Sequence, residues 1–457
     1  MSRKFFGTDG VRGVANEKLT PELATKLGIA AGRWLVETGQ PKRAVIGRDT
    51  RQSGTMLSAA LAAGLSAAGI DVVDVGVAPT PTVAFIARTG DFGLGAIVSA
   101  SHNPAPDNGI KFVGHDGRKL KDEVELHMES LMEGYSDRPT GGEIGNIAHD
   151  SRDVAAYVQA LLNILPERLD GMKIAMDCAD GAAYDIAPLA ARELGAELFL
   201  TGVTPDGTNI NREGGATKPE TIGRLTLARG ADIGVAFDGD ADRVVFCDEK
   251  GRLINGDRTM GIWAAHKQDG GKLDPAIVVG TVMSNGGFEQ YLTSKGIKLE
   301  RTPVGDKYVA QKIAETNALV GGEQSGHIIY PAHGPTGDGL ATMMEFLQVL
   351  RQSGRKASEF YDDYEPWPQL MVNVHVKSTE NWSGKLADEL KEAESRLGTD
   401  GRLVVRPSGT QPVIRVMVEA NNYELRDQVT DLLVGALETK LGGEVHGRVD
   451  LTYALGD

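Results

Sequence analysis

Short apolar runs alternate with amphipathic segments along most of the chain. The runs are typical of buried strands, and the segments between them carry apolar residues at helical spacing. The first expected helix begins after Thr20 with Pro21 at its first position, and Leu23, Leu27 and Ala31 then repeat every four residues. This alternation of strand and helix predicts mostly parallel sheets covered by helices.

The pattern divides the chain into three α/β units and a smaller α+β unit, with expected ranges 1–152, 153–255, 256–367 and 368–457. The expected strands are 44–46, 72–77, 173–176, 197–200, 233–237, 243–247, 276–280, 371–376, 403–405 and 413–418. The expected helices are 56–68, 183–194, 288–294, 340–351, 385–397 and 424–441. Residues 361–367, rich in Tyr, Asp and Pro, are expected to form a linker.

Composition narrows the class of protein. A chain of 457 residues exceeds what one core supports, and its net charge of -15 argues against a nucleic-acid partner. No apolar run of 18 residues and no N-terminal signal core occurs, so we expect a cytoplasmic protein with no membrane partner. Cys178 and Cys247 both follow apolar, strand-like residues and are expected to be buried thiols.

The apolar run that begins at Gly95 ends at Ser101, which lies among polar, turn-forming residues, and Lys111 follows ten residues on. Such a hydroxyl at the end of a strand can carry a phosphoryl or an acyl group. The chain has no Gly-x-Ser-x-Gly hydrolase motif around Ser101, no P-loop and no dinucleotide-binding fingerprint.

Asp238, Asp240 and Asp242 lie two residues apart between two expected strands. In an extended turn this spacing points the three carboxylates the same way, where they repel one another unless a cation lies between them. A hard divalent metal such as Mg²⁺ is therefore expected. An EF-hand is excluded because Arg243 stands where that loop needs glycine; the remaining alternative is a solvated acidic turn.

Two further loops carry groups that suit a sugar phosphate. Arg406-Pro-Ser408-Gly409-Thr410 lies between two strands, with Arg415 on the second strand, and is either a phosphate cradle or an ordinary hairpin loop. In the second loop, Glu323, Ser325 and His327 alternate, so that all three lie on one side and suit sugar hydroxyls.

Three more polar segments are less specific. Lys307 lies in a polar loop after Pro303, residues 7–13 form a glycine-rich turn that presents Arg12, and residues 47–51 carry an Arg–Asp pair that is either structural or in contact with a ligand. Taken together, a serine near a Mg²⁺ site and several phosphate cradles indicate phosphoryl transfer through the serine.

Five segments in this order resemble the α-D-phosphohexomutase family over the whole chain: residues 7–13, 99–104, 238–243, 322–327 and 406–410. The resemblance implies three similar α/β domains with mixed sheets around a cleft, plus a C-terminal α+β domain that closes over the substrate. Residues 7–13 and 322–327 are similar to the branch of the family that acts on glucosamine phosphates. A glucose or mannose phosphate mutase of the same family is the alternative.

The resemblance also implies a mechanism. Ser101 would be a phosphoserine that, with Asp238, Asp240 and Asp242, coordinates one Mg²⁺ per chain. It would donate its phosphate to glucosamine 6-phosphate and recover one from the resulting 1,6-bisphosphate, leaving glucosamine 1-phosphate for UDP-N-acetylglucosamine synthesis. Glucosamine 1,6-bisphosphate, or another hexose 1,6-bisphosphate, would act as activator.

The other residues receive roles by the same resemblance. Those expected to contact the sugar are Arg243, Lys307, Glu323, Ser325 and His327, and those expected to hold the phosphate that is not reacting are Arg406, Ser408, Gly409, Thr410 and Arg415. Lys111 and Arg12 are the candidates for transferring the hydroxyl proton and for positioning the serine phosphate. Proton transfer by Lys111 would require its pKa to be depressed.

Two functions of other classes remain open at this point. The first is a non-catalytic sugar-phosphate sensor in which Ser101 is a regulatory phosphorylation site. The second is a metal-dependent phosphatase, which would need water admitted to the cleft. The sequence leaves the oligomeric state open between a monomer and a homodimer.

Overall fold

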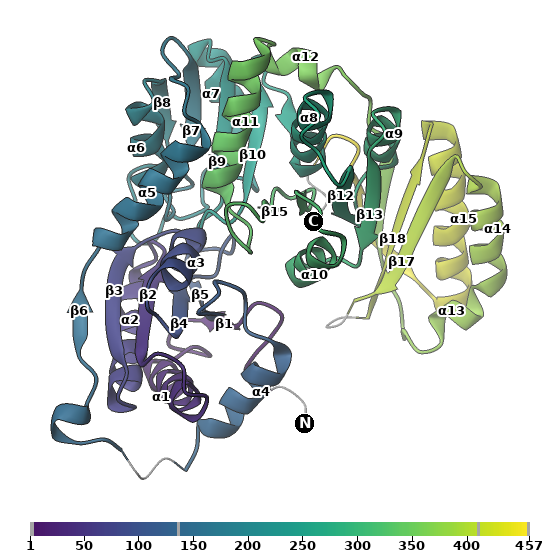
Figure 1. Ribbon diagram of the computed structural model, residues 1–457. Helices are drawn as coiled ribbons and strands as arrows, with labels where there is room; N and C mark the ends of the chain where they lie inside the picture. The colour runs from purple at the N-terminus through teal and green to yellow at the C-terminus, as the bar shows by residue number, and fades with distance from the viewer. Residues whose placement is uncertain (1–3, 135–137, 409–411, 455–457) are drawn as a thin grey trace.

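The structure, a computed structural model, describes residues 4–134, 138–408 and 412–454. It contains four sheets, one in each of four successive units that form an arc in Figure 1. We name the units by their strands: unit I holds β1 to β6, unit II β7 to β11, unit III β12 to β15 and unit IV β16 to β19. The fourth unit lies beside the third.

Unit I is built on a six-stranded sheet in the order β1-β5-β4-β2-β3-β6, in which β5 runs antiparallel to both its neighbours and the other contacts are parallel. The strands are β1 Val11–Val14, β2 Arg43–Arg48, β3 Asp71–Val77, β4 Leu94–Val98, β5 Asp107–Gly114 and β6 Ile147–His149. The helices are α1 Pro21–Glu37, α2 Gln52–Ala67, α3 Thr80–Thr89 and α4 Asp122–Leu131, and a 3₁₀ turn covers Gly141–Glu143.

Strand alternation builds the two cores of unit I. Ala44 and Ile46 pack in the cluster formed with α1 and α2, whereas Val45, which points the other way, packs with α3. The Thr20 cap is confirmed, since its hydroxyl accepts a hydrogen bond from the N–H of Leu23 at 3.3 Å. Helix α2 begins at Gln52, before the expected start at residue 56, because the alanine pattern does not extend over its first turn.

Units II and III share one continuous hydrophobic core, which runs from α5 through both sheets to α11 and α12. Unit II contains β7 Lys173–Asp177, β8 Glu197–Thr201, β9 Ile233–Phe237, β10 Val244–Asp248, β11 Leu253–Ile254, α5 Arg152–Ile164, α6 Ile186–Glu193 and α7 Glu220–Arg229. Unit III contains β12 Ile277–Thr281, β13 Lys298–Thr302, β14 Gly321–Gly322, β15 Ile328–Ile329, α8 Gly256–Asp269, α9 Gly286–Ser294, α10 Asp306–Thr316, α11 Gly339–Ser353 and α12 Ala357–Tyr361.

Both of these sheets are mixed. In unit II, β8, β7 and β9 are parallel while β10 and β11 join antiparallel; in unit III, β13, β12 and β14 are parallel and β15 is antiparallel. Helix α6 begins at Ile186, later than the expected residue 183, because Ala179 and Asp180 have positive φ and the chain turns before the helix starts.

Unit IV is an antiparallel sheet in the order β17-β18-β16-β19 with its helices packed on it. Its elements are β16 Gln369–His375, β17 Gly401–Pro407, β18 Val413–Ala420, β19 Glu444–Asp450, α13 Trp382–Lys385, α14 Ala387–Leu397 and α15 Tyr423–Leu441. The expected class, three α/β units with mixed sheets and a C-terminal α+β unit, is confirmed.

The expected linker at residues 361–367 is attached to unit III. Tyr361 ends α12, and the guanidinium of Arg258 on α8 lies over the rings of Tyr361 and Tyr364, at 3.8 and 4.5 Å from their centroids. The same guanidinium donates to both backbone carbonyls, so a segment with linker-like composition is held by cation–π contacts and hydrogen bonds.

Two smaller expectations are also tested. Cys178 and Cys247 are buried free thiols, as expected. Among the described residues, no helix is both long enough and apolar enough to cross a membrane.

Asp257, near the start of α8, carries a carboxylate whose burial destabilises the fold at neutral pH. Oδ2 accepts the N–H of Asn285 at 2.8 Å, but Oδ1 has no hydrogen-bond partner among the described residues. Burial raises the pKa of Asp257 to about 6 from 3.8. The folded state therefore binds this proton more tightly than the unfolded chain, and stability falls as pH rises from about 4 to about 6 and stays lower above that.

We expect Asp257→Asn to raise the unfolding free energy at pH 7.5 by roughly 1 to 3 kcal/mol and to flatten its pH dependence between 4 and 6. Urea unfolding of both proteins across this pH range measures it. Asp269→Asn, at the exposed end of the same helix, is the control and should change little. A variant less stable than its parent at pH 7.5 would contradict the prediction.

Candidate active site

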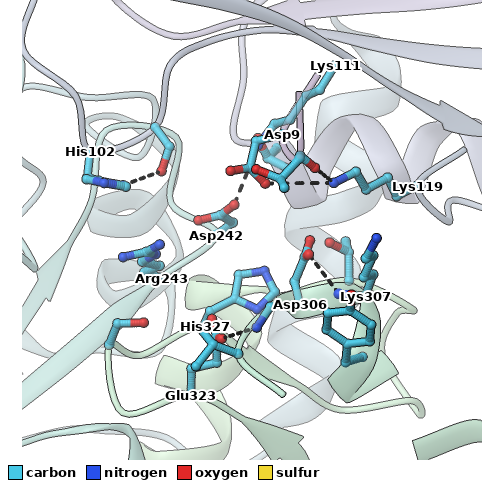
Figure 2. A pocket seen from close by; sticks show the side chains of 18 of the residues that line it. Asp9, His102, Lys111, Lys119, Asp242, Arg243, Asp306, Lys307, Glu323 and His327 are labelled. Carbon is cyan, nitrogen blue, oxygen red and sulfur yellow. Dashed lines mark hydrogen bonds and ion pairs between the residues drawn. The ribbon is translucent and has the colours of Figure 1, made fainter. Parts of the chain in front are cut away.

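A cavity of about 720 Å³ lies where the four units meet. Its lining includes Arg12, Ser101 and Lys111 from unit I, Asp242 and Arg243 from unit II, Lys307, Glu323, Ser325 and His327 from unit III, and Arg406 and Arg415 from unit IV. Figure 2 shows the lining side chains of units I and III facing each other across the cavity, with Asp242 and Arg243 between them. Residues far apart in the sequence thus meet at one site.

Ser101 lies in the turn that follows β4, at the edge of this cavity. Its φ of 52° is left-handed, a conformation that costs energy for a residue with a side chain. Its hydroxyl donates to Oδ2 of Asp238 at 2.6 Å, and its N–H donates to the hydroxyl of Ser99 at 2.9 Å. The expected placement of this hydroxyl at the end of a strand is confirmed.

The aspartate loop connects β9 and β10. One carboxylate oxygen from each of Asp238, Asp240 and Asp242 lies within 4.8 Å of the others. Asp238 and Asp240 are buried, which excludes the solvated acidic turn, and the flanking elements are strands instead of the helices of an EF-hand. Ala241, with a φ of 56°, forms the turn that makes the carboxylates converge.

These carboxylates fit a hard divalent cation. Burial and the charges of Asp242 and Asp240 raise the pKa of Asp238 well above its ordinary value. Oδ1 of Asp240 and Oδ1 of Asp242 are buried and have no hydrogen-bond partner within the described parts of the chain. Unpartnered, mutually repelling oxygens of this kind are the ligands that Mg²⁺ takes in proteins.

Lys111 on β5 is held by the aspartate loop as a cation. Its Nζ lies 2.6 Å from Asp240 and 3.5 Å from Asp242. Burial lowers the pKa of Lys111, but the two carboxylates outweigh burial and the pKa lies above its ordinary value. A general base would need a depressed pKa, so the depression expected for Lys111 has the wrong direction. The sequence did not show that two carboxylates face this amine.

A positioned cation can be replaced by another cation, whereas a base cannot. We expect Lys111→Arg to retain roughly ten times more hexose-phosphate turnover than Lys111→Met. Steady-state assays of the two variants measure this ratio, with the exposed Lys121→Met as control. Equal losses in both Lys111 variants would favour a proton-transfer role.

The 323–327 loop, which carries Glu323, Ser325 and His327, is the tight turn between β14 and β15. Ser325 and His327 are buried yet line the cavity, and Oε1 of Glu323 accepts the N–H of Gly305 at 3.0 Å. This hydrogen bond ties the loop to the start of α10. Lys307 lies in the first turn of that helix and not in a loop as expected, and it faces Asp122 of unit I at 3.4 Å.

Arg406 and Arg415 form a cationic pair on unit IV. They lie opposite each other on β17 and β18, and both line the cavity. Burial and the charge of Arg415 lower the pKa of Arg406. Two guanidinium groups placed together in this way repel each other, and an anion bound between them would relieve that repulsion. Ser408 comes directly after the last residue of β17, whereas the predicted Gly409 and Thr410 lie outside the described residues.

We expect Arg406→Ala to raise the KM for a hexose phosphate by roughly 10- to 100-fold, because a charge-assisted contact to phosphate is lost, while kcat changes less. Steady-state kinetics over a wide substrate range measure both constants. Arg396→Ala on the exposed face of α14 is the control. An unchanged KM for Arg406→Ala would exclude this arginine from phosphate binding.

Sequence reasoning missed several residues at the site. Thr80 at the start of α3 donates its N–H to the backbone carbonyl of Asp240 at 2.9 Å and its hydroxyl to the carboxylate. Lys119 and Asp306 also line the cavity, and Asp9 lies 3.7 Å from Lys119. Two of these residues carried a signal, since Asp9 belongs to the glycine-rich turn that presents Arg12 and Asp306 belongs to the polar segment before Lys307.

Four family models match the chain in order. They are the phosphoglucomutase/phosphomannomutase alpha/beta/alpha domains I, II and III, over residues 3–138, 155–251 and 255–367, and the C-terminal domain over residues 371–435. The chain therefore belongs to the phosphoglucomutase/phosphomannomutase family, and it is an isomerase of the phosphohexomutase class. The family resemblance inferred from the five motifs is confirmed.

Phosphoglucosamine mutases are among the proteins of this family that are similar to the chain. That of Maricaulis maris is 46% identical over 452 residues, which cover 97% of this chain and 100% of that protein. That of Cereibacter sphaeroides is 46% identical over 445 residues, covering 96% and 99%. That of Desulforamulus reducens is 45% identical over 434 residues, covering 94% and 98%.

Solved structures share the fold. A phosphoglucomutase/phosphomannomutase family protein from Burkholderia thailandensis has a TM-score of 0.81 and 26% identity, and the match covers 96% of this chain and 98% of that one. The N-acetylphosphoglucosamine mutase of Aspergillus fumigatus, in complex with GlcNAc-6P and magnesium, has a TM-score of 0.64 and covers 95% and 96%. At 19% identity the latter likeness concerns the fold alone.

Proposed function

We propose that this chain interconverts glucosamine 6-phosphate and glucosamine 1-phosphate through a phosphoserine at Ser101. The observation that carries the proposal is the contact of 2.6 Å between the Ser101 hydroxyl and Asp238, at a cavity that Ser101 lines together with the 323–327 loop and the arginine pair. The phosphoglucosamine mutases that are similar over nearly the whole chain support the choice of sugar.

In the first half-reaction, a hydroxyl oxygen of the sugar forms a bond to the phosphorus of phospho-Ser101, and the bond from phosphorus to Oγ breaks. The net transfer of the hydroxyl proton to Oγ restores the serine and leaves a 1,6-bisphosphate. This bisphosphate turns around. Oγ of Ser101 then forms a bond to the other phosphorus, the bond from that phosphorus to the sugar oxygen breaks, and the net transfer of the serine proton to the sugar oxygen leaves the monophosphate product and a phosphorylated enzyme. Asp238, which accepts the hydroxyl of Ser101, holds Oγ in place while the serine carries no phosphate, before Oγ takes a phosphoryl group from the bisphosphate.

Asp238, Asp240 and Asp242 are the residues that would hold one Mg²⁺. When bound, this ion neutralises negative charge on the phosphoryl group in transfer. Lys111 and Arg12, both on the cavity wall, add positive charge on the same side. The hexose 1,6-bisphosphate that the reaction forms also serves as activator, because it can phosphorylate Ser101 in an enzyme that has lost its phosphate.

The remaining walls bind the substrate in both of its orientations. The groups that we assign to the sugar are Arg243, Lys307, Glu323, Ser325 and His327, and those assigned to the distant phosphate are Arg406, Ser408, Gly409, Thr410 and Arg415. The first set comes from loops of units II and III and from the first turn of α10, and the second belongs to unit IV. A bisphosphate held between two separate sets of polar groups can find equivalent contacts in either of its two orientations.

Turnover of three sugar 6-phosphates tests the proposal. With a trace of the matching 1,6-bisphosphate, we expect kcat/KM for glucosamine 6-phosphate to exceed that for glucose 6-phosphate and mannose 6-phosphate by at least about tenfold. A preference for glucose or mannose would establish the other branch of the family. Release of inorganic phosphate in place of an isomer would identify a phosphatase.

A further inference from the structure

Arg51 is buried behind the loop that carries Ser101. This loop, residues 99–107, is called the serine loop below. The guanidinium of Arg51 donates to the backbone carbonyls of Ser101 at 3.0 Å, Asn103 at 2.7 Å and Asp107 at 3.0 Å, and also to that of Pro104. One rigid, planar cation, 1% exposed, thus holds four carbonyls of one turn.

Asp49 and Ser99 complete the arrangement. Asp49 lies 2.9 Å from Nε of Arg51 and accepts the hydroxyl of Ser99 at 2.6 Å. The same hydroxyl of Ser99 accepts the N–H of Ser101 at 2.9 Å. The chain of contacts therefore starts beyond the end of β2 and reaches Ser101 from both sides, through its N–H and its carbonyl oxygen.

The free energy needed to bury the Asp49–Arg51 ion pair indicates that the pair does more than stabilise the fold. Burial raises the pKa of Asp49 even though Arg51 lies beside it. A fully buried ion pair of this kind contributes little net stability, because desolvation cancels much of the attraction. Ser101 moreover has a left-handed backbone that the surrounding contacts must maintain. Asn211 of unit II adds a second donor to its carbonyl at 2.8 Å.

We propose that Arg51, held by Asp49, is a positioning residue that returns the Ser101 oxygen to one place in both half-reactions. The inference rests on the proposed function, in which Oγ gives up a phosphoryl group and then takes one from the reoriented bisphosphate. A phosphoryl acceptor that drifts between these steps loses its alignment with the incoming phosphorus. Arg51 makes none of its hydrogen bonds to Asp238, Asp240 or Asp242 and acts only through the serine loop.

Two variants test this role. Arg51→Lys keeps the charge but cannot reach four carbonyls, and Ser99→Ala removes only the hydroxyl between Asp49 and Ser101. We expect each to lower kcat by roughly 10- to 100-fold, with KM changed less than about threefold. The rate at which glucose 1,6-bisphosphate phosphorylates Ser101, followed by intact mass, should fall in parallel. A purely structural role would leave the kcat of the folded fraction unchanged.

Matched controls are Arg43→Lys, at the other end of β2, and Ser58→Ala, a buried serine of α2 whose hydroxyl has no partner among the described residues. Parental kcat and phosphorylation rate in both test variants would overturn the inference, as would a rise in KM alone. If Arg51→Lys does not fold, Ser99→Ala decides. If the parent does not turn over glucosamine 6-phosphate, the proposed function fails, while phosphorylation of Ser101 by the bisphosphate still decides the role of Arg51.

Discussion

Replacing Ser101 with alanine is expected to lower hexose-phosphate turnover by roughly four orders of magnitude or more, because the hydroxyl that we propose as the phosphoryl carrier is removed. Alanine leaves the hydrogen bonds of the loop backbone in place but has no side-chain oxygen to accept a phosphoryl group. The buried aspartates and the arginine pair remain in place, so substrate binding should survive. Loss of kcat with a nearly unchanged substrate dissociation constant is the expected signature.

Intact mass separates this outcome from a regulatory role. The parent is expected to carry a phosphate that exchanges with added bisphosphate, and Ser101→Ala is expected to carry none. Ser130→Ala on the exposed face of α4 is the control and should retain both activity and the phosphate. Full activity of Ser101→Ala would remove the phosphoserine mechanism and leave the sensor hypothesis.

The second large effect is expected at the aspartate loop. Asp238→Asn keeps the shape of the side chain and an oxygen for the Ser101 hydroxyl but removes one negative charge from the site. We expect activity in Mg²⁺ to fall by roughly 100-fold or more, because the metal is held less tightly and charge on the phosphoryl group is less well neutralised.

The same substitution is expected to have opposite effects on stability with and without metal. In EDTA the variant should melt at a higher temperature than the parent, since burial and the two neighbouring carboxylates raise the pKa of Asp238 and oppose its charged form. Added Mg²⁺ should raise the melting temperature of the parent and change that of the variant little.

Thermal unfolding with EDTA and with MgCl₂ measures both effects. Asp185→Asn is the control, because Asp185 is exposed and its side chain makes no helix-capping hydrogen bond. Equal gains from Mg²⁺ in the parent and in Asp238→Asn would place the metal elsewhere. A lower melting temperature of the variant in EDTA would show that repulsion does not dominate at this loop.

Local patterns predicted those features whose causes are local. The helix that starts after Thr20 and the strand at 233–237 were found because capping and apolar periodicity depend on neighbours a few residues away. The start of α2 and the helical position of Lys307 were missed because their causes are not local. Neither first turn has an apolar pattern, and contacts from other parts of the chain hold both.

The groups of the candidate site show the same division between features with local causes and features that depend on distant residues. By itself the sequence determined that Ser101 follows a strand and that Asp238, Asp240 and Asp242 lie on one loop between two strands. Their convergence was expected from an extended turn, whereas in the structure it comes from a turn at the left-handed Ala241. Only the tertiary structure decided that Lys111 faces those aspartates and stays protonated. It likewise placed Arg51 against four carbonyls and brought the arginines of unit IV to the same cavity. Charge, burial and alignment depend on residues that are distant along the chain, and folding alone brings them within contact distance.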